Sequence, residues 1–148
     1  MIIGIERVHH IAMTVPDLKV AHDFYVGLLG LVETSRKRWT QGDARMDAIV
    51  GLRGTSGELF FADAGNISFE FFRFDTPASP RLEQDRPVNM CGYTHFCLQV
   101  SDIHGIYERL HEAGMHFHTP PSTGPLGTIA TYGRDPFGNV IELYQPPD

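Results

Sequence analysis

The chain lacks a long hydrophobic run. No part of its 148 residues approaches the roughly 20 consecutive apolar residues that a transmembrane helix needs. Its first five residues, Met1 to Ile5, show neither the basic start nor the apolar segment of a secretory signal. We therefore expect no membrane partner and no export.

Cysteine is also scarce, since the chain contains only two. Cys91 and Cys97 lie close together around one expected strand, which favours free thiols over a disulfide. Free thiols are typical of a reducing compartment. The sequence therefore predicts a cytoplasmic protein.

Positive charge is in deficit, because the formal net charge is −6. A nucleic-acid partner would call for a basic surface, so this class of partner is excluded. One basic cluster remains, Arg36-Lys37-Arg38, with Arg45 nearby. It is either a solvated strand face or loop, or a site for an anionic substrate or a coenzyme phosphate.

What the chain does have is an internal repeat. Residues 8–15 and residues 92–100 each form an apolar strand pattern with a histidine near its start. In each case an acidic residue, Asp17 or Asp102, follows where a helix would begin. The same unit is therefore expected twice.

Hydrophobic periodicity extends this unit in both halves. The first half predicts a helix at 18–29 and strands at 8–15, 31–38, 44–52, 58–62 and 67–74. The second predicts a helix at 103–112 and strands at 92–100, 115–118, 128–132 and 140–145. We interpret these as two βαβββ modules, about 5–75 and 91–146, joined by a linker at 76–90 within one domain, 1–148. The predicted fold is α+β, with a cup-shaped mixed sheet and helices on its outer face.

Each module carries one histidine on its first strand and one glutamate on its last. These four residues are His10, Glu70, His95 and Glu142. Strand alternation places both histidines on the face away from the helices. A carboxylate within an apolar strand is costly unless it is paired or coordinated. Two imidazoles and two carboxylates suit zinc, nickel, cobalt, manganese or ferrous iron. The alternative is that each of the four is an ordinary strand residue.

Several other residues could belong to such a site. Alternation places His9 on the face opposite His10, and His116 and His118 are interpreted as surface residues. Cys97 shares the face of His95 and is read as a small pocket or core residue. For two more positions both interpretations stay open: Tyr132 points into the cup or packs in the core, and Trp39 lines a pocket or covers a strand edge.

Three groups of residues resemble the vicinal oxygen chelate superfamily. They are Val8 to Leu18 with Phe24-Tyr25 and Leu28-Leu29-Gly30-Leu31; Gly92 to Phe96 with Arg109 to Gly114; and Asp135-Pro136-Phe137-Gly138-Asn139-Val140-Ile141-Glu142-Leu143. This superfamily contains paired βαβββ modules and includes glyoxalase I, methylmalonyl-CoA epimerase, extradiol dioxygenases and bleomycin-resistance proteins. The resemblance implies that the metal ligands are His10, Glu70, His95 and Glu142. It also implies a small-molecule substrate and a homodimer, with modules that pair within one chain or between two.

The ligand set is similar to that of glyoxalase I and close to that of methylmalonyl-CoA epimerase. The resemblance therefore implies a metal-dependent lyase or isomerase that transfers a proton next to a carbonyl through a metal-stabilised enediolate, with Glu142 or Glu70 as base. One alternative is a ferrous-iron dioxygenase of the extradiol type acting on an aromatic diol. Another is a non-catalytic protein that binds a small molecule.

Overall fold

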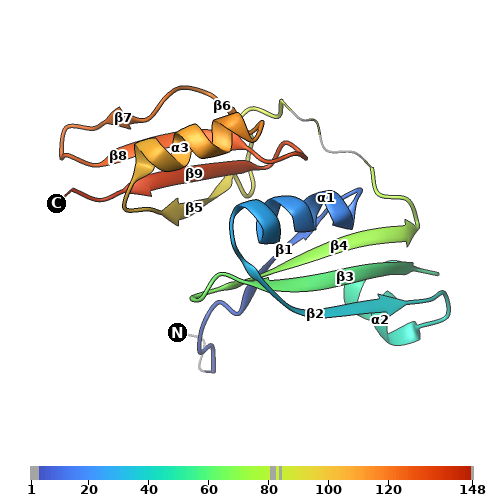
Figure 1. The fold of residues 1–148 in the computed structure, drawn as a ribbon. Helices are drawn as coiled ribbons and strands as arrows, with labels where there is room; N and C mark the ends of the chain where they lie inside the picture. The colour runs from blue at the N-terminus through green and yellow to red at the C-terminus, as the bar shows by residue number, and fades with distance from the viewer. Residues whose placement is uncertain (1–3, 81–82, 84, 148) are drawn as a thin grey trace. The chain divides into compact units, whose positions relative to one another are not determined.

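The computed structural model describes residues 4–80, 83 and 85–147. It divides into two compact units, residues 1–81 and residues 82–148. The division falls inside the segment 76–90 that the sequence assigns to a linker. In each unit a helix lies over one face of a β-sheet (Figure 1).

The first unit is built on a mixed four-stranded sheet with the order β1-β4-β3-β2. β1 is parallel to β4, and the other neighbours are antiparallel. The helical segment after β1 begins at the N-cap Asp17, whose side chain accepts hydrogen bonds from the backbone of Lys19 and Val20. The elements are β1 (His10–Thr14), α1 (Leu18–His22), the π-helical turn η1 (Asp23–Leu28), β2 (Val32–Trp39), α2 (Ala44–Val50), β3 (Ser56–Asp63) and β4 (Ser68–Thr76).

Aromatic side chains fill the space between this sheet and its helical segment. Tyr25 and Phe71 are fully buried, with ring centroids 4.5 Å apart. Phe60 stacks on Phe71 from the neighbouring strand at 4.7 Å. Because side chains alternate along a strand, residues 68, 70 and 72 of β4 lie on the opposite face from this core. Glu70 therefore lies on the face away from the helix.

The second unit repeats the arrangement with shorter strands. Its path is β5-β9-β8-β6, with β7 also paired to β8, and β5 is parallel to β9. Ile141 and Leu143 of β9 are fully buried and Ile103 of α3 nearly so, which leaves Glu142 on the other face. The elements are β5 (His95–Gln99), α3 (Ile103–Glu112), β6 (His116–Phe117), β7 (Ser122–Thr123), β8 (Ile129–Arg134) and β9 (Val140–Gln145).

The predicted α+β class with mixed sheets is confirmed. Each unit has a strand, a helix and then the strands that complete its sheet. Within the described ranges, no helix has the length and apolar character needed to cross a membrane.

One predicted strand is wrong, because residues 44–52 contain the helix α2 instead. The Asp43 side chain accepts a hydrogen bond from the backbone of Met46 at 3.0 Å and so begins this helix. Gly51 ends it with a left-handed φ of 69°. Local capping therefore overrides an apolar pattern that strand periodicity explained equally well. With this strand removed, the first unit has the βαβββ order with one added helix.

The structure also decides between the two interpretations of Trp39. Its side chain is 7% exposed, and its Nε1 donates a hydrogen bond to Thr55 Oγ1 at 3.0 Å. The ring packs against Phe74 and over Gly57. Trp39 therefore closes one end of the first sheet, which is a structural role.

This packing makes Gly57 a sensitive position. A Cβ added there would lie 2.3 Å from the carbonyl oxygen of Arg73 and 2.5 Å from the Trp39 ring. We expect Gly57→Ala to lower the free energy of unfolding of this unit by about 1–3 kcal/mol, the usual cost of overpacking. Urea unfolding followed by the fluorescence of Trp39, the only tryptophan, measures the change.

Gly27 provides a matched control in the same unit. A Cβ there has no neighbour closer than 4.0 Å, and alanine is the better helix former. Gly27→Ala should leave stability unchanged or raise it by up to about 1 kcal/mol. Equal losses in the two variants would contradict the packing account.

Candidate metal centre

The first half-site consists of His10 and Glu70. Ala12 of β1 pairs with Glu70 of β4, and His10 pairs with Ser68. Glu70 thus lies two residues beyond the partner of His10, on the same face of the sheet. The two side chains meet with Nε2 of His10 3.2 Å from Oε2 of Glu70.

The second half-site consists of His95 and Glu142, and it has the same register. His95 pairs with Val140 and Cys97 pairs with Glu142. Glu142 is again two residues beyond the partner of its histidine. Nε2 of His95 lies 3.0 Å from Oε2 of Glu142. The structure therefore brings together two of the predicted residues in each unit, at equivalent positions of the repeat.

The strand beside each glutamate distinguishes the two half-sites. Phe61 pairs with Glu70, and its ring centroid lies 5.5 Å from that of His10. Tyr132 pairs with Glu142, and its ring centroid lies 4.8 Å from that of His95. Tyr132 therefore lies beside the second half-site rather than in the core. The first half-site borders an apolar ring at the place where the second borders a phenol.

Cys97 adds a further polar group to the second half-site. It is a free and exposed thiol, as is Cys91, so it is not a core residue, and it occupies the place that Ala12 holds in the first module. Partial desolvation raises the pKa of its thiol to about 11, and the charge of Glu142 and a hydrogen bond to it act in the same direction. The neutral thiol is a poor nucleophile. Cys97 is therefore suited to support Glu142 rather than to attack a substrate.

Burial is the largest influence on the pKa of the Glu70 carboxyl group. This side chain belongs to the buried set, with the residue 9% exposed. Desolvation raises its pKa, while the charges of His10, Lys37 and His9 act to lower it. A carboxylate in this position is stabilised by any nearby cation. At the second half-site, burial followed by the charges of Glu142 and Cys97 raises the pKa of Tyr132.

The predicted orientation of His9 is wrong. β1 begins at His10, so His9 precedes the strand and is not bound by strand alternation. Its Nδ1 lies 2.9 Å from Nδ1 of His10, with the rings perpendicular. His9 therefore contacts a candidate ligand directly. A doubled histidine at the strand edge was the available signal, but sequence periodicity alone assigned it to the other face.

His116 and His118 lie at the far edge of the second sheet. The ring of His118 is 6.4 Å from that of Tyr132, and its pKa is lowered by burial and by the charges of Arg134 and His116. In the parts of the chain that the structure describes, no three His, Cys, Asp or Glu residues gather closely enough to form a metal site on their own. The candidate donors therefore come as two pairs.

Both pairs fit the donor geometry of a divalent ion. Two ligands that bind one ion at about 2.1 Å, with an angle of 90–109° between them, are about 3.0–3.4 Å apart. The nitrogen–oxygen distances of 3.2 and 3.0 Å lie in this range. Imidazole nitrogen and carboxylate oxygen are donors for zinc and for the neighbouring transition metals. The residues present are therefore suitable for the metal that the sequence implies.

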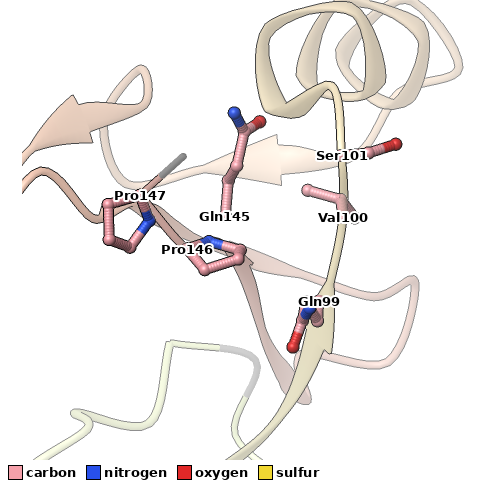
Figure 2. Close-up of a pocket in the computed structure, with 6 residues that line it drawn as sticks. All are labelled: Gln99, Val100, Ser101, Gln145, Pro146 and Pro147. Carbon is pink, nitrogen blue, oxygen red and sulfur yellow. The ribbon is translucent and has the colours of Figure 1, made fainter.

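A separate surface pocket of about 400 Å³ lies where β5 and β9 end, and Figure 2 shows its lining. Gln145 in this lining is already engaged, because its Oε1 accepts a hydrogen bond from the backbone of Ile103 at the start of α3. No charged side chain and neither half-site lines this pocket; its residues are Gln99, Val100, Ser101, Gln145, Pro146 and Pro147. It is not a second metal site.

Comparison with known proteins identifies the family of this chain. The model of the Glyoxalase/Bleomycin resistance protein/Dioxygenase superfamily matches residues 7–143. The chain therefore belongs to this superfamily, as the resemblance of its motifs implied.

Individual relatives agree with this assignment. The chain is 29% identical to a 2-epi-5-epi-valiolone epimerase from Actinomyces sp., over 97% of this chain and 81% of that protein. A glyoxalase family protein from Bacillus cereus has the same fold, with a TM-score of 0.88, 22% identity and full coverage of both chains. A lactoylglutathione lyase from Agrobacterium tumefaciens is similar at a TM-score of 0.59, with 23% identity over 96% of this chain and 95% of that one.

The pKa of Cys97 yields a test of this geometry in metal-free protein. With a pKa of about 11, only about one thiol in a thousand is ionised at pH 8, and the thiolate is the reactive form. In a Cys91→Ser background, we expect the rate of iodoacetamide alkylation to rise about tenfold per pH unit between pH 7 and 9.5. Mass spectrometry measures the rate.

Removal of the neighbouring charge should accelerate the reaction. Glu142→Gln abolishes one cause of the raised pKa, so alkylation at pH 8 should become faster, while burial still keeps it slower than for a free thiol. A rate that reaches a plateau below pH 9 in the parent protein would contradict the raised pKa, and a rate that Glu142→Gln leaves unchanged would contradict the contact between Cys97 and Glu142.

Proposed function

We propose that this protein is a divalent-metal-dependent isomerase or lyase that moves a proton on the carbon next to a carbonyl. The observation that carries the proposal is the repeated pair: a histidine and a glutamate occur in the same strand register in both modules, with their donor atoms 3.2 and 3.0 Å apart. A single such pair would be an ordinary hydrogen bond. Its repetition on the helix-free face of two sheets favours a shared task.

In this proposal each half-site supplies two of the four ligands, which are His10, Glu70, His95 and Glu142. The donors suit zinc, nickel, cobalt, manganese or ferrous iron. When bound, such an ion acts as a Lewis acid that withdraws charge from a carbonyl oxygen and so acidifies the neighbouring C–H bond.

The residues of the chain handle the proton. Glu142 or Glu70, released from the ligand set, accepts the proton from the carbon and returns it to a neighbouring atom in an isomerisation. An epimerisation requires that the other glutamate, in its acid form, donates a proton from the opposite face of the carbon. At the first half-site, the Phe61 ring packs edge-on against His10 and forms an apolar wall beside the pair. The neutral Cys97 thiol donates its hydrogen bond to Glu142 and so orients that carboxylate.

Among the reactions open to this superfamily, the relative from Actinomyces supports an isomerase. Its name describes an epimerase, and it aligns with 97% of this chain. Epimerisation next to a carbonyl is the proton transfer described above. The similarity to the lactoylglutathione lyase, at 23% identity, supports the fold alone.

Metal content tests the proposal. After reconstitution with zinc or nickel and dialysis, we expect one ion per chain by elemental analysis, because each chain holds one set of four ligands. His95→Ala and Glu142→Ala should each weaken binding by more than about a hundredfold, since even an outer partner of a ligand contributes about 10–100-fold.

His22 is a matched control, because its Nε2 lies 3.2 Å from Oε2 of Glu33 outside both half-sites. His22→Ala should keep full metal content. The proposal fails if the parent protein holds no stoichiometric metal, or if His95→Ala and Glu142→Ala retain all of it. Oxygen uptake with a catechol that requires ferrous iron would instead indicate a dioxygenase.

A further inference from the structure

The basic cluster Arg36-Lys37-Arg38 is divided by the sheet. Arg36 lies 4.9 Å over the Phe60 ring, on the helix side. Trp39 packs against Phe74 on the opposite face. Because side chains alternate, Lys37 shares the face of Trp39. Its strand partner Leu59 in turn pairs with Phe72, two residues from Glu70 on β4. Lys37 therefore lies on the face that holds the first half-site.

The two arginines are neutralised and the lysine is not. Arg36 forms ion pairs with Glu33 at 2.9 Å and Glu58 at 3.1 Å. Arg38 lies 3.6 Å from Glu58 and 3.8 Å from Asp75. Within the described part of the chain, Lys37 forms no ion pair, although its charge acts on Glu70. Of the three cations, Lys37 alone both lacks an ion pair within the described residues and lies on the face of the half-site.

The strand between Lys37 and the half-site carries apolar side chains on this face. Phe61, which pairs with Glu70, is partly exposed, and Leu59, two residues along the same strand, is buried beneath the surface at 6% exposed. Strands lie about 4.8 Å apart and rise about 6.7 Å per two residues, so the Cα atoms of Glu70 and Lys37 are about 12 Å apart. A small molecule whose carbonyl lies at the half-site can extend over this strip to the ammonium group.

We propose that Lys37 binds a carboxylate or phosphate group on the substrate, which makes the substrate an anionic carbonyl compound. This inference rests on the proposed function, because it places the carbonyl at the His10–Glu70 pair. A solvated ammonium is stable without a partner, so the anion is recognised at little cost to folding. In the second module Tyr132 takes the place of Phe61, so Ala130, two residues before it, takes the place of Leu59. The strand partner of Ala130 is Ser122, which therefore takes the place of Lys37. The charge is specific to one half-site.

Matched pairs of probes test this with zinc-loaded protein. The carboxylate pair is 4-oxopentanoate and neutral 5-hydroxypentan-2-one; the phosphate pair is dihydroxyacetone phosphate and dihydroxyacetone. By isothermal titration calorimetry, we expect at least one anion to bind about tenfold more tightly than its neutral partner, as for a charge-assisted hydrogen bond. The pair that shows the preference identifies the anionic group.

Substitutions assign the preference to Lys37. Lys37→Gln should remove it and Lys37→Arg should keep it. Arg45→Gln should have no effect, since this arginine lies on the exposed helix α2. Equal affinity of the parent for anion and neutral partner, no binding of either anion, or a preference that survives Lys37→Gln would overturn the proposal. Zinc content measured in the same samples separates this failure from that of the proposed function, because Lys37 is not a ligand.

A different observation concerns His9. Both ring nitrogens of His10 are engaged: Nε2 with Glu70 at 3.2 Å and Nδ1 with Nδ1 of His9 at 2.9 Å. When the Nδ1–H group of His10 donates a hydrogen bond to His9, the ring is in the tautomer whose Nε2 carries no proton. The lone pair of Nε2 is then directed toward Glu70. The partner of the second nitrogen fixes the tautomer and the ring orientation of a metal-binding histidine. Thr94 occupies the equivalent place before His95 and, among the described residues, makes no hydrogen bond with it.

We infer that His9 is a positioning residue that holds His10 ready to bind the metal of the proposed function. Zinc affinity, measured by competition with a chelator, tests this without any substrate. His9→Leu should weaken binding about 10–100-fold. His9→Asn should restore affinity to within about threefold of the parent, because an amide oxygen can accept the same hydrogen bond.

Thr94→Val serves as the control in the second module and should leave zinc affinity unchanged. Parent affinity in His9→Leu, or a His9→Asn variant as weak as His9→Leu, would overturn the inference. Loss of zinc binding by the parent itself would instead count against the proposed function.

Discussion

A carboxylate held against a histidine on a mostly apolar strand is the constraint on which each module depends. Glu70 sits between Phe69 and Phe71, two of the most buried rings of the first unit. Alternation turns its side chain to the other face, where burial still penalises the charge. His10 at 3.2 Å offsets part of this cost. The sheet thus presents an incompletely neutralised donor pair, which is a suitable starting point for binding a cation.

The repeat keeps this pair and varies what surrounds it. In the first module the pair borders Phe61, with Lys37 beyond an apolar strip. In the second it borders Tyr132 and the thiol of Cys97. Equal register fixes the same donors in both modules, because the strands pair in the same way. The neighbouring positions differ, so one half-site borders an apolar ring and a cation while the other borders groups that donate hydrogen bonds.

Much of the fold could be predicted from the sequence, and the failures have local causes. Hydrophobic periodicity predicts the strands β4 and β9 and the helix α3. Residues 44–50 form a helix because Asp43 and Gly51 cap them, a signal that competes with an apolar strand pattern of similar length. His9 was assigned to the wrong face because alternation begins only where the strand does, and boundaries are the least certain feature of such a pattern.

The sequence by itself determined the repeat, the α+β class and the presence of one histidine on the first strand and one glutamate on the last strand of each module, because these depend on periodicity and on position within each strand. Only the tertiary structure decided which side chains meet. In the structure, Lys37 lies on the face of the half-site, and its two arginine neighbours pair with carboxylates on the other face of the sheet. His9 contacts His10. The physical reason is that strand register and the exact start of a strand depend on partners distant in the chain, which local pattern does not contain.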